Sequence, residues 1–562
     1  MKTIFRKCHA QIFFVVAYCL GLALVPQYPV DIDEPSLRSH GTFNLINAVR
    51  ILLPSALPTK YSACDAISCF PSLENWNAFT HGAWFEMLLS LLEFVFGFEN
   101  TSKLGGDNFH QIYLMRHYVT FSLCFVGLVN LYYLLRREFR SSQIAYTGVG
   151  LAITSPRLFS SGFWDVKNMI FLSMLTIGIN FLSKYFTSRK LGFLLASGVI
   201  LGLSAGRRIV GVGAILVVGL LIALHSRNKG LELKFHREKL NHSFLFLLIG
   251  FVSLVVSMPY LWSSPLIRFL GVLKGNANFQ LFKGLIWYDG RLVSPSNLPR
   301  SYLPHWIFIT MPIYQLVLLT LSLLMISWWL ISRKMTRIVM QHPAILAYLL
   351  FCLICIIYVF VFNPVNYAGW AHFYFLQLGF VLIGCAGIKI VLDFFSDWLN
   401  IRWARIIIFG SLLLASMPSV TWMLLNHPYQ RSYFNSFAGP KEMIPYNWSE
   451  ASGYGLELFA FRWIIQNDDS RPITIDSVGN FPLSTATNLL NSREVKKLCF
   501  VGRNPLCKDI KPKYIIDTLN YDVSFGEGSK GDFQKPSSED YKIEKVWKIE
   551  GQPLMYLYKK VD

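Results

Sequence analysis

The sequence predicts an α-helical membrane protein that crosses the bilayer many times and carries a small α/β domain at its C-terminus. Of the 562 residues, 53% are hydrophobic and only 15% are charged, whereas a soluble globular protein carries about 25% charged residues. The apolar residues gather in runs long enough to cross a bilayer, and basic residues stand in the short linkers between them. This pattern excludes a cytosolic enzyme, a secreted disulfide scaffold and a disordered regulator.

About 11 apolar runs are predicted to be transmembrane helices. The first begins after a basic stretch and resembles a signal peptide, but no small-x-small cleavage site follows it, so we interpret it as a retained anchor. The predicted spans are 12–26, 112–135, 143–156, 168–183, 191–205, 209–224, 243–261, 305–331, 343–362, 373–392 and 406–425.

The net charge of +19 reflects membrane topology. Every second linker is basic, as cytoplasmic loops are under the positive-inside rule, and no motif for reading nucleic acid accompanies these residues. The N-terminus is therefore predicted to be cytoplasmic, and an odd number of spans places the C-terminus on the opposite side. Basic residues of this kind include Lys7, Arg136, Arg137, Lys184, Arg237, Lys334, Arg402 and Arg405.

The domains follow from this topology. Residues 1–426 are predicted to form the transmembrane domain, with exoplasmic loops at 27–111 and 262–304, and residues 427–562 an exoplasmic α/β domain. The first loop contains an amphipathic pattern at 83–98 that predicts a helix. In the tail, a helix is predicted at 454–466 and strands at 473–475, 514–516, 543–549 and 555–558.

Two local cysteine pairs lie on the side predicted to be oxidising. Cys64 and Cys69 share the first outer loop, and Cys499 and Cys507 share the tail. Two disulfides are expected, because a zinc site needs four ligands at compatible spacing and none can be assembled.

Three carboxylates follow the first span directly, in the segment Asp31-Ile32-Asp33-Glu34. Crowded like charges at a membrane surface raise the pKa of at least one member, which suits a general base near neutral pH. The alternative is an ordinary solvated loop, and spacing alone does not separate the two.

The segment Asp33-Glu34-Pro35 and a series of later blocks together resemble the C-type (GT-C) membrane glycosyltransferases, which take a sugar from a polyprenyl-phosphate carrier. More narrowly they resemble glycosyltransferase family 39, the dolichyl-phosphate-mannose-protein mannosyltransferase-like group, and its bacterial relatives. The later blocks, in order, are His81-Gly82 with Phe85-Glu86, Arg116-His117, Ser155-Pro156-Arg157-Leu158-Phe159, Phe163-Trp164-Asp165-Val166-Lys167-Asn168, Gly206-Arg207-Arg208-Ile209, Trp287-Tyr288-Asp289-Gly290, Leu298-Pro299-Arg300-Ser301-Tyr302, Tyr367-Ala368-Gly369-Trp370-Ala371-His372 and His427-Pro428-Tyr429-Gln430.

The resemblance implies a GT-C fold and an inverting single displacement, in which Asp33 accepts the proton of an acceptor hydroxyl. Glu34 would orient the site or meet a cation, and Asp31 and Asp165 are further carboxylates. The leaving phosphate needs positive charge at its oxygens, with Arg207 or Arg208 as the favoured clamp. The full set of candidate cations is Arg157, Lys167, Arg207, Arg208, Arg300 and His372.

Each candidate has a structural alternative. Arg207 and Arg208 are also explained as interfacial residues whose charged ends reach water, Lys167 as a partner of Asp165, and His372 as a satisfied polar residue. Departures from the family pattern, such as Ala371 for its Arg, fall where donor and acceptor selectivity would lie. The resemblance therefore implies neither a mannosyl donor nor a protein acceptor.

We expect a polyprenyl-phosphate-linked sugar as donor and a lipid-linked glycan, a lipid or a protein as acceptor, in a bacterial inner membrane rather than an endoplasmic reticulum. No cofactor is required by the sequence, although Asp31, Asp33, Glu34 and Asp165 would suit Mg²⁺ or Mn²⁺ if their loops meet. The rival functions are a lipid-glycan transporter or flippase and a catalytically silent envelope-assembly protein with the same fold. Transporters carry inverted repeats and mid-membrane charges, whereas the distinctive charges here lie at span ends.

Overall fold

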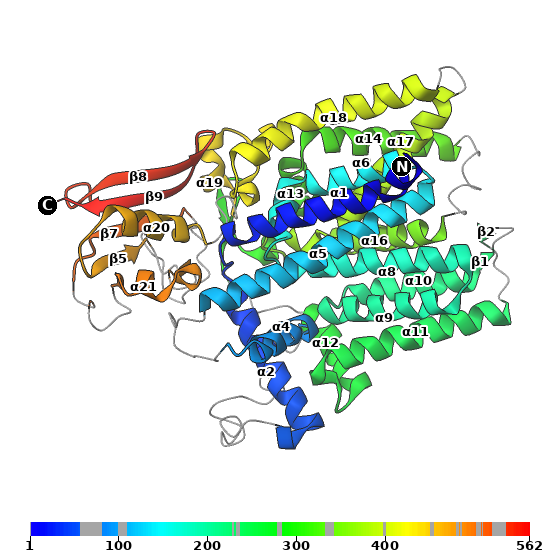
Figure 1. Ribbon diagram of the computed structural model, residues 1–562, viewed down its shortest axis with the longest axis horizontal. Helices are drawn as coiled ribbons and strands as arrows, with labels where there is room; N and C mark the ends of the chain where they lie inside the picture. Colours follow the sequence, from blue (N-terminus) through cyan, green and yellow to red (C-terminus); the bar gives the residue numbers. More distant parts are fainter. Residues whose placement is uncertain are drawn as a thin grey trace.

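A bundle of long helices carries a small sheet domain at one end in the computed structural model (Figure 1). The structure describes residues 2–56, 81–98, 109–226, 230–231, 236–277, 284–331, 342–396, 401–449, 455–478, 483, 486–501, 507, 510–519 and 536–561. The fold class predicted from sequence, a helical membrane protein with a small C-terminal α/β domain, is confirmed.

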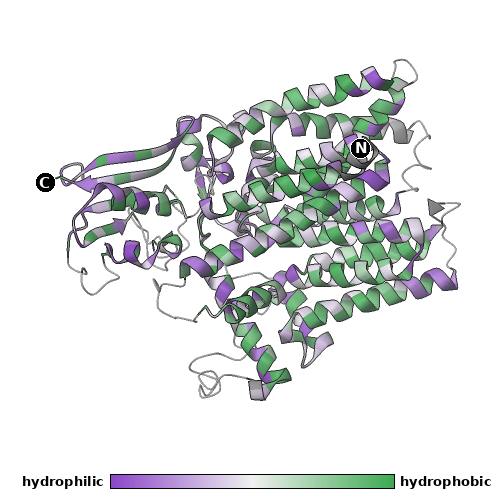
Figure 2. Cartoon of the chain, viewed as in Figure 1, coloured by the Kyte–Doolittle hydropathy of each residue, from purple (hydrophilic) through white to green (hydrophobic). Residues whose placement is uncertain are grey.

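Within these residues, seven helices are long and apolar enough to cross a membrane. Figure 2 shows apolar residues along the bundle and polar ones concentrated at its ends and in the sheet domain. The seven are α1 (Lys2–Leu24), α5 (Phe109–Phe139), α8 (Asn168–Ser188), α11 (Arg237–Ser257), α16 (Pro343–Phe362), α17 (Leu376–Ser396) and α18 (Ile401–Leu425).

The remaining predicted spans are also helical but shorter. The run at 305–331 is broken in two, because Met311 takes an extended conformation before Pro312, which disfavours the helical region for its neighbour. Its two parts and the other short helices of the bundle are α6 (Ser142–Ile153), α7 (Pro156–Ser161), α9 (Leu191–Arg207), α10 (Gly211–Leu224), α13 (Tyr302–Thr310) and α14 (Ile313–Ile331).

In the described part of the first long loop, two helices lie beside the end of the bundle. The predicted amphipathic helix is present as α4 (Trp84–Val95), and it packs on α2 (Glu34–Leu52). The sequence did not predict α2, because its buried face includes polar residues such as His40 and Asn44, which hide the apolar periodicity. The second loop contains α12 (Pro265–Ala277) and a hairpin of β3 (Ile286–Tyr288) and β4 (Arg291–Val293).

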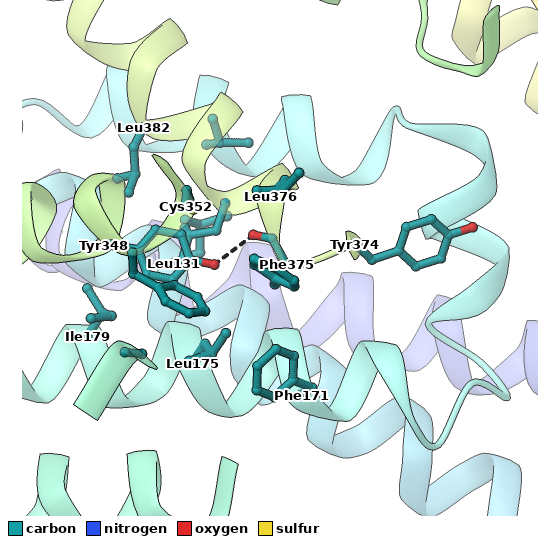
Figure 3. Close-up of a cluster of buried hydrophobic side chains, with 14 of the residues drawn as sticks. Leu131, Phe171, Leu175, Ile179, Tyr348, Cys352, Tyr374, Phe375, Leu376 and Leu382 are labelled. Atoms are coloured by element: carbon teal, nitrogen blue, oxygen red, sulfur yellow. Dashed lines mark hydrogen bonds between the residues drawn. The ribbon is translucent and has the colours of Figure 1, made fainter. Parts of the chain in front are cut away.

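The bundle core is close-packed between helices that are distant in sequence. In Figure 3, Leu175 of α8 lies near Tyr348 of α16 and Phe171 of α8 lies near Phe375, and the Tyr348 hydroxyl donates to the Phe375 carbonyl at 2.6 Å. That hydrogen bond satisfies a buried polar group, and it fixes the loop before α17 against α16. Two short strands of two residues each, β1 (His225–Ser226) and β2 (Gly230–Leu231), pair at the end of the bundle opposite to the sheet domain.

The C-terminal domain is built on a five-stranded mixed sheet. Strand order is β6-β5-β7-β9-β8, with β5 parallel to β6 and β7, and β9 antiparallel to β7 and β8. The predicted helix and strands are present, whereas β6 was not predicted. The elements are α20 (Glu457–Asn467), α21 (Ser492–Val495), β5 (Ile473–Ser477), β6 (Leu498–Phe500), β7 (Tyr514–Asp517), β8 (Tyr541–Ile549) and β9 (Gln552–Lys560).

The sheet domain packs directly on the bundle end. Val30 and Tyr113 belong to the same apolar cluster as Phe461 and Leu557 of the domain. Gly455 lies so close to the Val30 carbonyl that a Cβ there would be 2.6 Å from its oxygen. The predicted Cys499–Cys507 disulfide is present, and the predicted Cys64–Cys69 pair lies outside the described residues.

Candidate active site

The carboxylate of Asp33 forms an ion pair at the end of the bundle where the sheet domain lies. Asp33 stands at the N-terminus of α2, yet its side chain makes no cap hydrogen bond to that helix. Instead it accepts from Lys167 Nζ at 2.7 Å. The Asp33 side chain is 56% exposed and that of Lys167 19%, so the carboxylate is both held in place and accessible to a substrate.

The charge state of this pair suits a base. The Lys167 ammonium, outweighing burial, holds the pKa of Asp33 below its ordinary value. Burial works against the charged form of Lys167, but the Asp33 carboxylate keeps the pKa of that amine above its usual value. Asp33 is therefore ionised at neutral pH, and the raised pKa predicted for one of the crowded carboxylates belongs to Asp31.

Glu34 turns away from Asp33 and into the protein. Its carboxylate lies 2.9 Å from His117 Nε2 of α5 and accepts from the Asp31 backbone N–H at 2.7 Å. The Glu34 side chain is only 2% exposed. These contacts fix the course of the segment that carries Asp33.

Asp165 joins the loop before α8 to the end of α9 through Asn168. Its Oδ1 accepts from the backbone N–H groups of Lys167 at 3.0 Å and Asn168 at 2.8 Å, and its Oδ2 accepts from Asn168 Nδ2 at 2.8 Å. The Asn168 amide oxygen in turn accepts from Arg208 Nη2. The predicted Lys167–Asp165 side-chain pair is replaced by this network, which leaves the Lys167 amine on Asp33.

The two adjacent arginines have different environments. The Arg207 guanidinium is buried and donates to the Glu86 carboxylate, to the Gly82 carbonyl and, at 2.9 Å, to the Val166 carbonyl. These contacts leave no face toward the Asp33–Lys167 pair, so the geometry does not favour Arg207 as a phosphate clamp. Arg208 is half-buried, and its Nε has no hydrogen-bond partner among the described residues.

His372 lies in the loop before α17 and shares the electrostatic environment of the pair. Burial, followed by the charges of Arg208 and Lys167, holds the pKa of His372 well below its ordinary value. Its imidazole is therefore neutral at pH 7 and does not carry the positive charge expected of it. His81, before α4, is kept neutral by the same causes, with burial again the largest.

The other two predicted cations contact aromatic rings. Arg157 of α7 is buried over the Phe434 ring at 4.5 Å, and its Nε donates to the Tyr433 carbonyl at 3.0 Å. It thereby fastens the segment after α18 to the bundle. Arg300 is exposed and lies 5.8 Å from the ring centre of Phe360 in α16.

Arg431 is a site residue that sequence reasoning missed. Its Nη1 lies 3.6 Å from the Asp31 carboxylate, and its guanidinium stacks 4.6 Å from the centre of the Trp164 ring. Burial raises the pKa of Asp31 to about 8, although Arg431 opposes that rise. The signal that could have found it is its position directly after the His427–Gln430 block, which resembles the family pattern.

The carboxylates proposed as an oxygen-rich metal site are not brought together. Glu34 faces His117, Asp165 caps α8 and Asp31 faces Arg431. No group of three or more His, Cys, Asp or Glu residues in the described part of the chain is arranged to hold a metal ion. The expectation of a shared Mg²⁺ or Mn²⁺ site is therefore not supported by this geometry.

Comparison with solved structures finds similar chains. ArnT from Cupriavidus metallidurans bound to undecaprenyl phosphate is 12% identical, with 98% of each chain covered and a TM-score of 0.45. The Archaeoglobus fulgidus oligosaccharyltransferase tethered with an acceptor peptide is 10% identical, with 92% of this chain and 69% of that chain covered and a TM-score of 0.45. No protein-family model and no curated protein matches this chain. At these identities and scores, function has to be argued from the site.

Proposed function

We propose that this protein is an integral membrane glycosyltransferase that moves a sugar from a polyprenyl-phosphate carrier to an acceptor hydroxyl. The observation that carries the proposal is the accessible Asp33–Lys167 pair at 2.7 Å, flanked by Arg208. It supports an ionised base and cations suited to a phosphate close together at one end of the bundle. The ordered blocks from Asp33 to Gln430 that resemble the GT-C enzymes support the same chemistry.

Asp33 would act as the general base. In a single displacement with inversion, one carboxylate removes the proton of the acceptor hydroxyl while the bond from the anomeric carbon to the phosphate breaks. The proton passes to Asp33 and the bonding electrons leave with the phosphate. Lys167 keeps Asp33 ionised until the acceptor binds. Glu34 fixes the position of the segment that carries Asp33.

Lys167 and Arg208 would hold the leaving phosphate. An ammonium has three donors, so Lys167 can contact a phosphate oxygen while it stays on Asp33. Arg208 has a buried Nε without a partner among the described residues, and its Nη2 is fixed by Asn168. A guanidinium held this way can form charge-assisted hydrogen bonds to a phosphate.

The reaction side follows from the charge distribution of the linkers. Under the positive-inside rule, the bundle end with Asp33 and the sheet domain would face the exoplasm, which in a bacterial inner membrane is the periplasmic side. No observation in the structure favours the transporter or the silent protein over the transferase.

The proposal is tested by product analysis. Purified protein in lipid nanodiscs is incubated with a panel of polyprenyl-phosphate sugars and total membrane lipid and protein as acceptors. We expect sugar to leave one donor, and NMR to show inversion of the anomeric configuration in the product. Retention would contradict Asp33 as a sole base, and no release from any donor, with or without added divalent metal, would favour the silent or transport functions.

A further inference from the structure

An apolar cavity of about 310 Å³ lies between helices of the bundle, next to the candidate active site, and exposed side chains such as Leu20, 64% exposed, form part of its lining. It is lined by α1, α5, α6, α7, α8 and α17, among them Ala17, Cys124, Ala152 and Val381. Of its few polar neighbours, Ser173 and Thr176 donate their hydroxyls to carbonyls of their own helix, whereas the buried Oε1 of Gln377 has no hydrogen-bond partner among the described residues. A cavity with these walls suits a hydrocarbon chain and offers little to water.

The cavity ends at the segment that carries the base. Phe163 borders the cavity and stacks on Tyr28, with ring centres 4.4 Å apart and an interplanar angle of 19°. Tyr28 in turn begins the segment that leads to Asp31 and Asp33. A chain in the cavity would therefore place its polar end beside these carboxylates.

The cavity and Arg208 lie on different flanks of the bundle. Arg208 follows α9, which packs on α8 and α4, and neither α9 nor α4 lines the cavity. In Figure 1, α4 and α9 lie on one side of α5 and α8, and α1, α6 and α17 lie on the other.

This separation assigns the cavity to one substrate. Inversion requires the acceptor hydroxyl to attack the face of the anomeric carbon opposite to the leaving phosphate. If Arg208 and Lys167 hold the phosphate, the acceptor approaches from the flank of α1 and α6, where the cavity lies. A small pocket on that flank, lined by Asp31, Trp164 and Arg431, supplies hydrogen-bonding groups and an aromatic ring for a polar head.

We infer that the acceptor is a membrane lipid, whose hydrocarbon chain occupies the cavity between α1, α5, α6 and α17 while its hydroxylated head lies between Asp31 and Asp33. The inference rests on the proposed function. It restricts the acceptor, which could otherwise be a lipid, a lipid-linked glycan or a protein, to an amphiphilic molecule with a hydrocarbon chain. A polypeptide acceptor would bring no hydrocarbon chain to this apolar surface.

Filling the cavity tests the inference. Ala17→Phe and Cys124→Phe add a ring within its lining, and Val16→Phe and Val126→Phe add the same ring to residues of α1 and α5 that face outward, 53% and 46% exposed. All four variants and wild type are reconstituted in nanodiscs made from total membrane lipid. A cavity-filling variant counts as folded when its melting temperature equals that of the two control variants.

The readout is the destination of radiolabelled sugar from a polyprenyl-phosphate donor. Mild acid cleaves the sugar phosphate but not a glycoside, so acid-stable label in the organic phase measures transfer to lipid. We expect wild type and the two controls to make this product, and the cavity-filling variants to lose about tenfold or more, because each excluded CH₂ removes a favourable burial contribution. The KM for the donor should not change.

Three results would overturn the inference. Label in the protein fraction would make the acceptor a polypeptide, a raised donor KM in the filled variants would assign the cavity to the donor chain, and equal transfer by filled and control variants would leave the cavity without a role. If wild type releases no sugar from the donor at all, the proposed function itself fails. That result is distinct from the other three, in which wild type is active.

Discussion

Two carboxylate–cation pairs lie at the same end of the bundle and differ in their access to solvent. The Glu86 and Arg207 side chains are both 0% exposed, whereas Asp33 is 56% exposed and Lys167 19%. The buried pair joins α4 to α9, and the second carboxylate oxygen of Glu86 has no hydrogen-bond partner among the described residues. The accessible pair joins the segment after α1 to the loop before α8 and leaves a carboxylate open to a substrate.

The comparison shows that burial and existing partners decide whether a charged side chain can bind a ligand, more than the type of residue does. Arg207 and Arg208 are adjacent in sequence but differ in their hydrogen bonds. The Arg207 guanidinium donates to Glu86 and to two carbonyls, whereas the Nε of Arg208 has no partner among the described residues. Burying a charge requires compensation from a partner, and a fully compensated charge has nothing left for a ligand.

The largest expected effect comes from breaking the buried pair. Glu86→Ala leaves the Arg207 guanidinium buried without its counter-charge, which costs about 3–5 kcal/mol of folding stability. We expect a much lower melting temperature and poor recovery from membranes. As a control, Asp393→Ala removes one member of an exposed pair with Lys389 and should change stability little. Equal stability of the two variants would contradict the structural role of Glu86.

The second effect separates the adjacent arginines by function. Arg208→Met should raise the KM for the polyprenyl-phosphate donor about 10- to 100-fold, because a hydrogen bond to a charged group contributes about 1.5–3 kcal/mol. The melting temperature should stay near that of wild type. This KM is measured by varying the donor concentration at a fixed acceptor concentration. An unchanged KM would show that Arg208 does not bind the phosphate.

A pH profile tests the coupling within the accessible pair. Because Lys167 holds the pKa of Asp33 below its ordinary value, the acidic limb of kcat/KM should lie below the usual carboxyl range. Lys167→Met removes the ammonium and should move that limb to higher pH, since protonation of the base then occurs more readily. A limb that stays in place would mean that another group controls it.

The smallest effect concerns Asn168, which positions Arg208. Asn168→Ala removes the amide that accepts from Arg208 Nη2, and we expect a rise in donor KM of about fivefold, the value of one ordinary hydrogen bond. In an Arg208→Met background the same change should add almost nothing. Additive effects in the double variant would mean that Asn168 acts independently of Arg208.

Much of the fold was predictable because long apolar runs indicate membrane-spanning helices directly. All of the predicted spans are helices, yet the break at Met311–Pro312 and the helix α2 were missed. A proline signal is easily lost within an apolar run, and α2 buries polar side chains such as His40. The strand β6 is only three residues long, too short for a clear alternation.

The candidate site was predictable as a set of residue types but not as a set of contacts. The crowded carboxylates after α1 lie in the candidate site, and each has a different partner in the structure: Asp33 pairs with Lys167, Glu34 with His117 and Asp31 with Arg431. Sequence cannot reveal which carboxylate turns inward, because those partners lie tens to hundreds of residues away.

The most direct test of Asp33 as the base compares turnover with folding in one substitution. Asp33→Asn keeps the size of the side chain and removes the proton acceptor, with Asp393→Asn as the matched change at another exposed, lysine-paired carboxylate. Sugar transfer and melting temperature are measured on the same preparations. The account predicts a loss of about 100-fold or more in kcat for Asp33→Asn, with melting temperatures equal to wild type for both variants. Unchanged transfer by folded Asp33→Asn would contradict it.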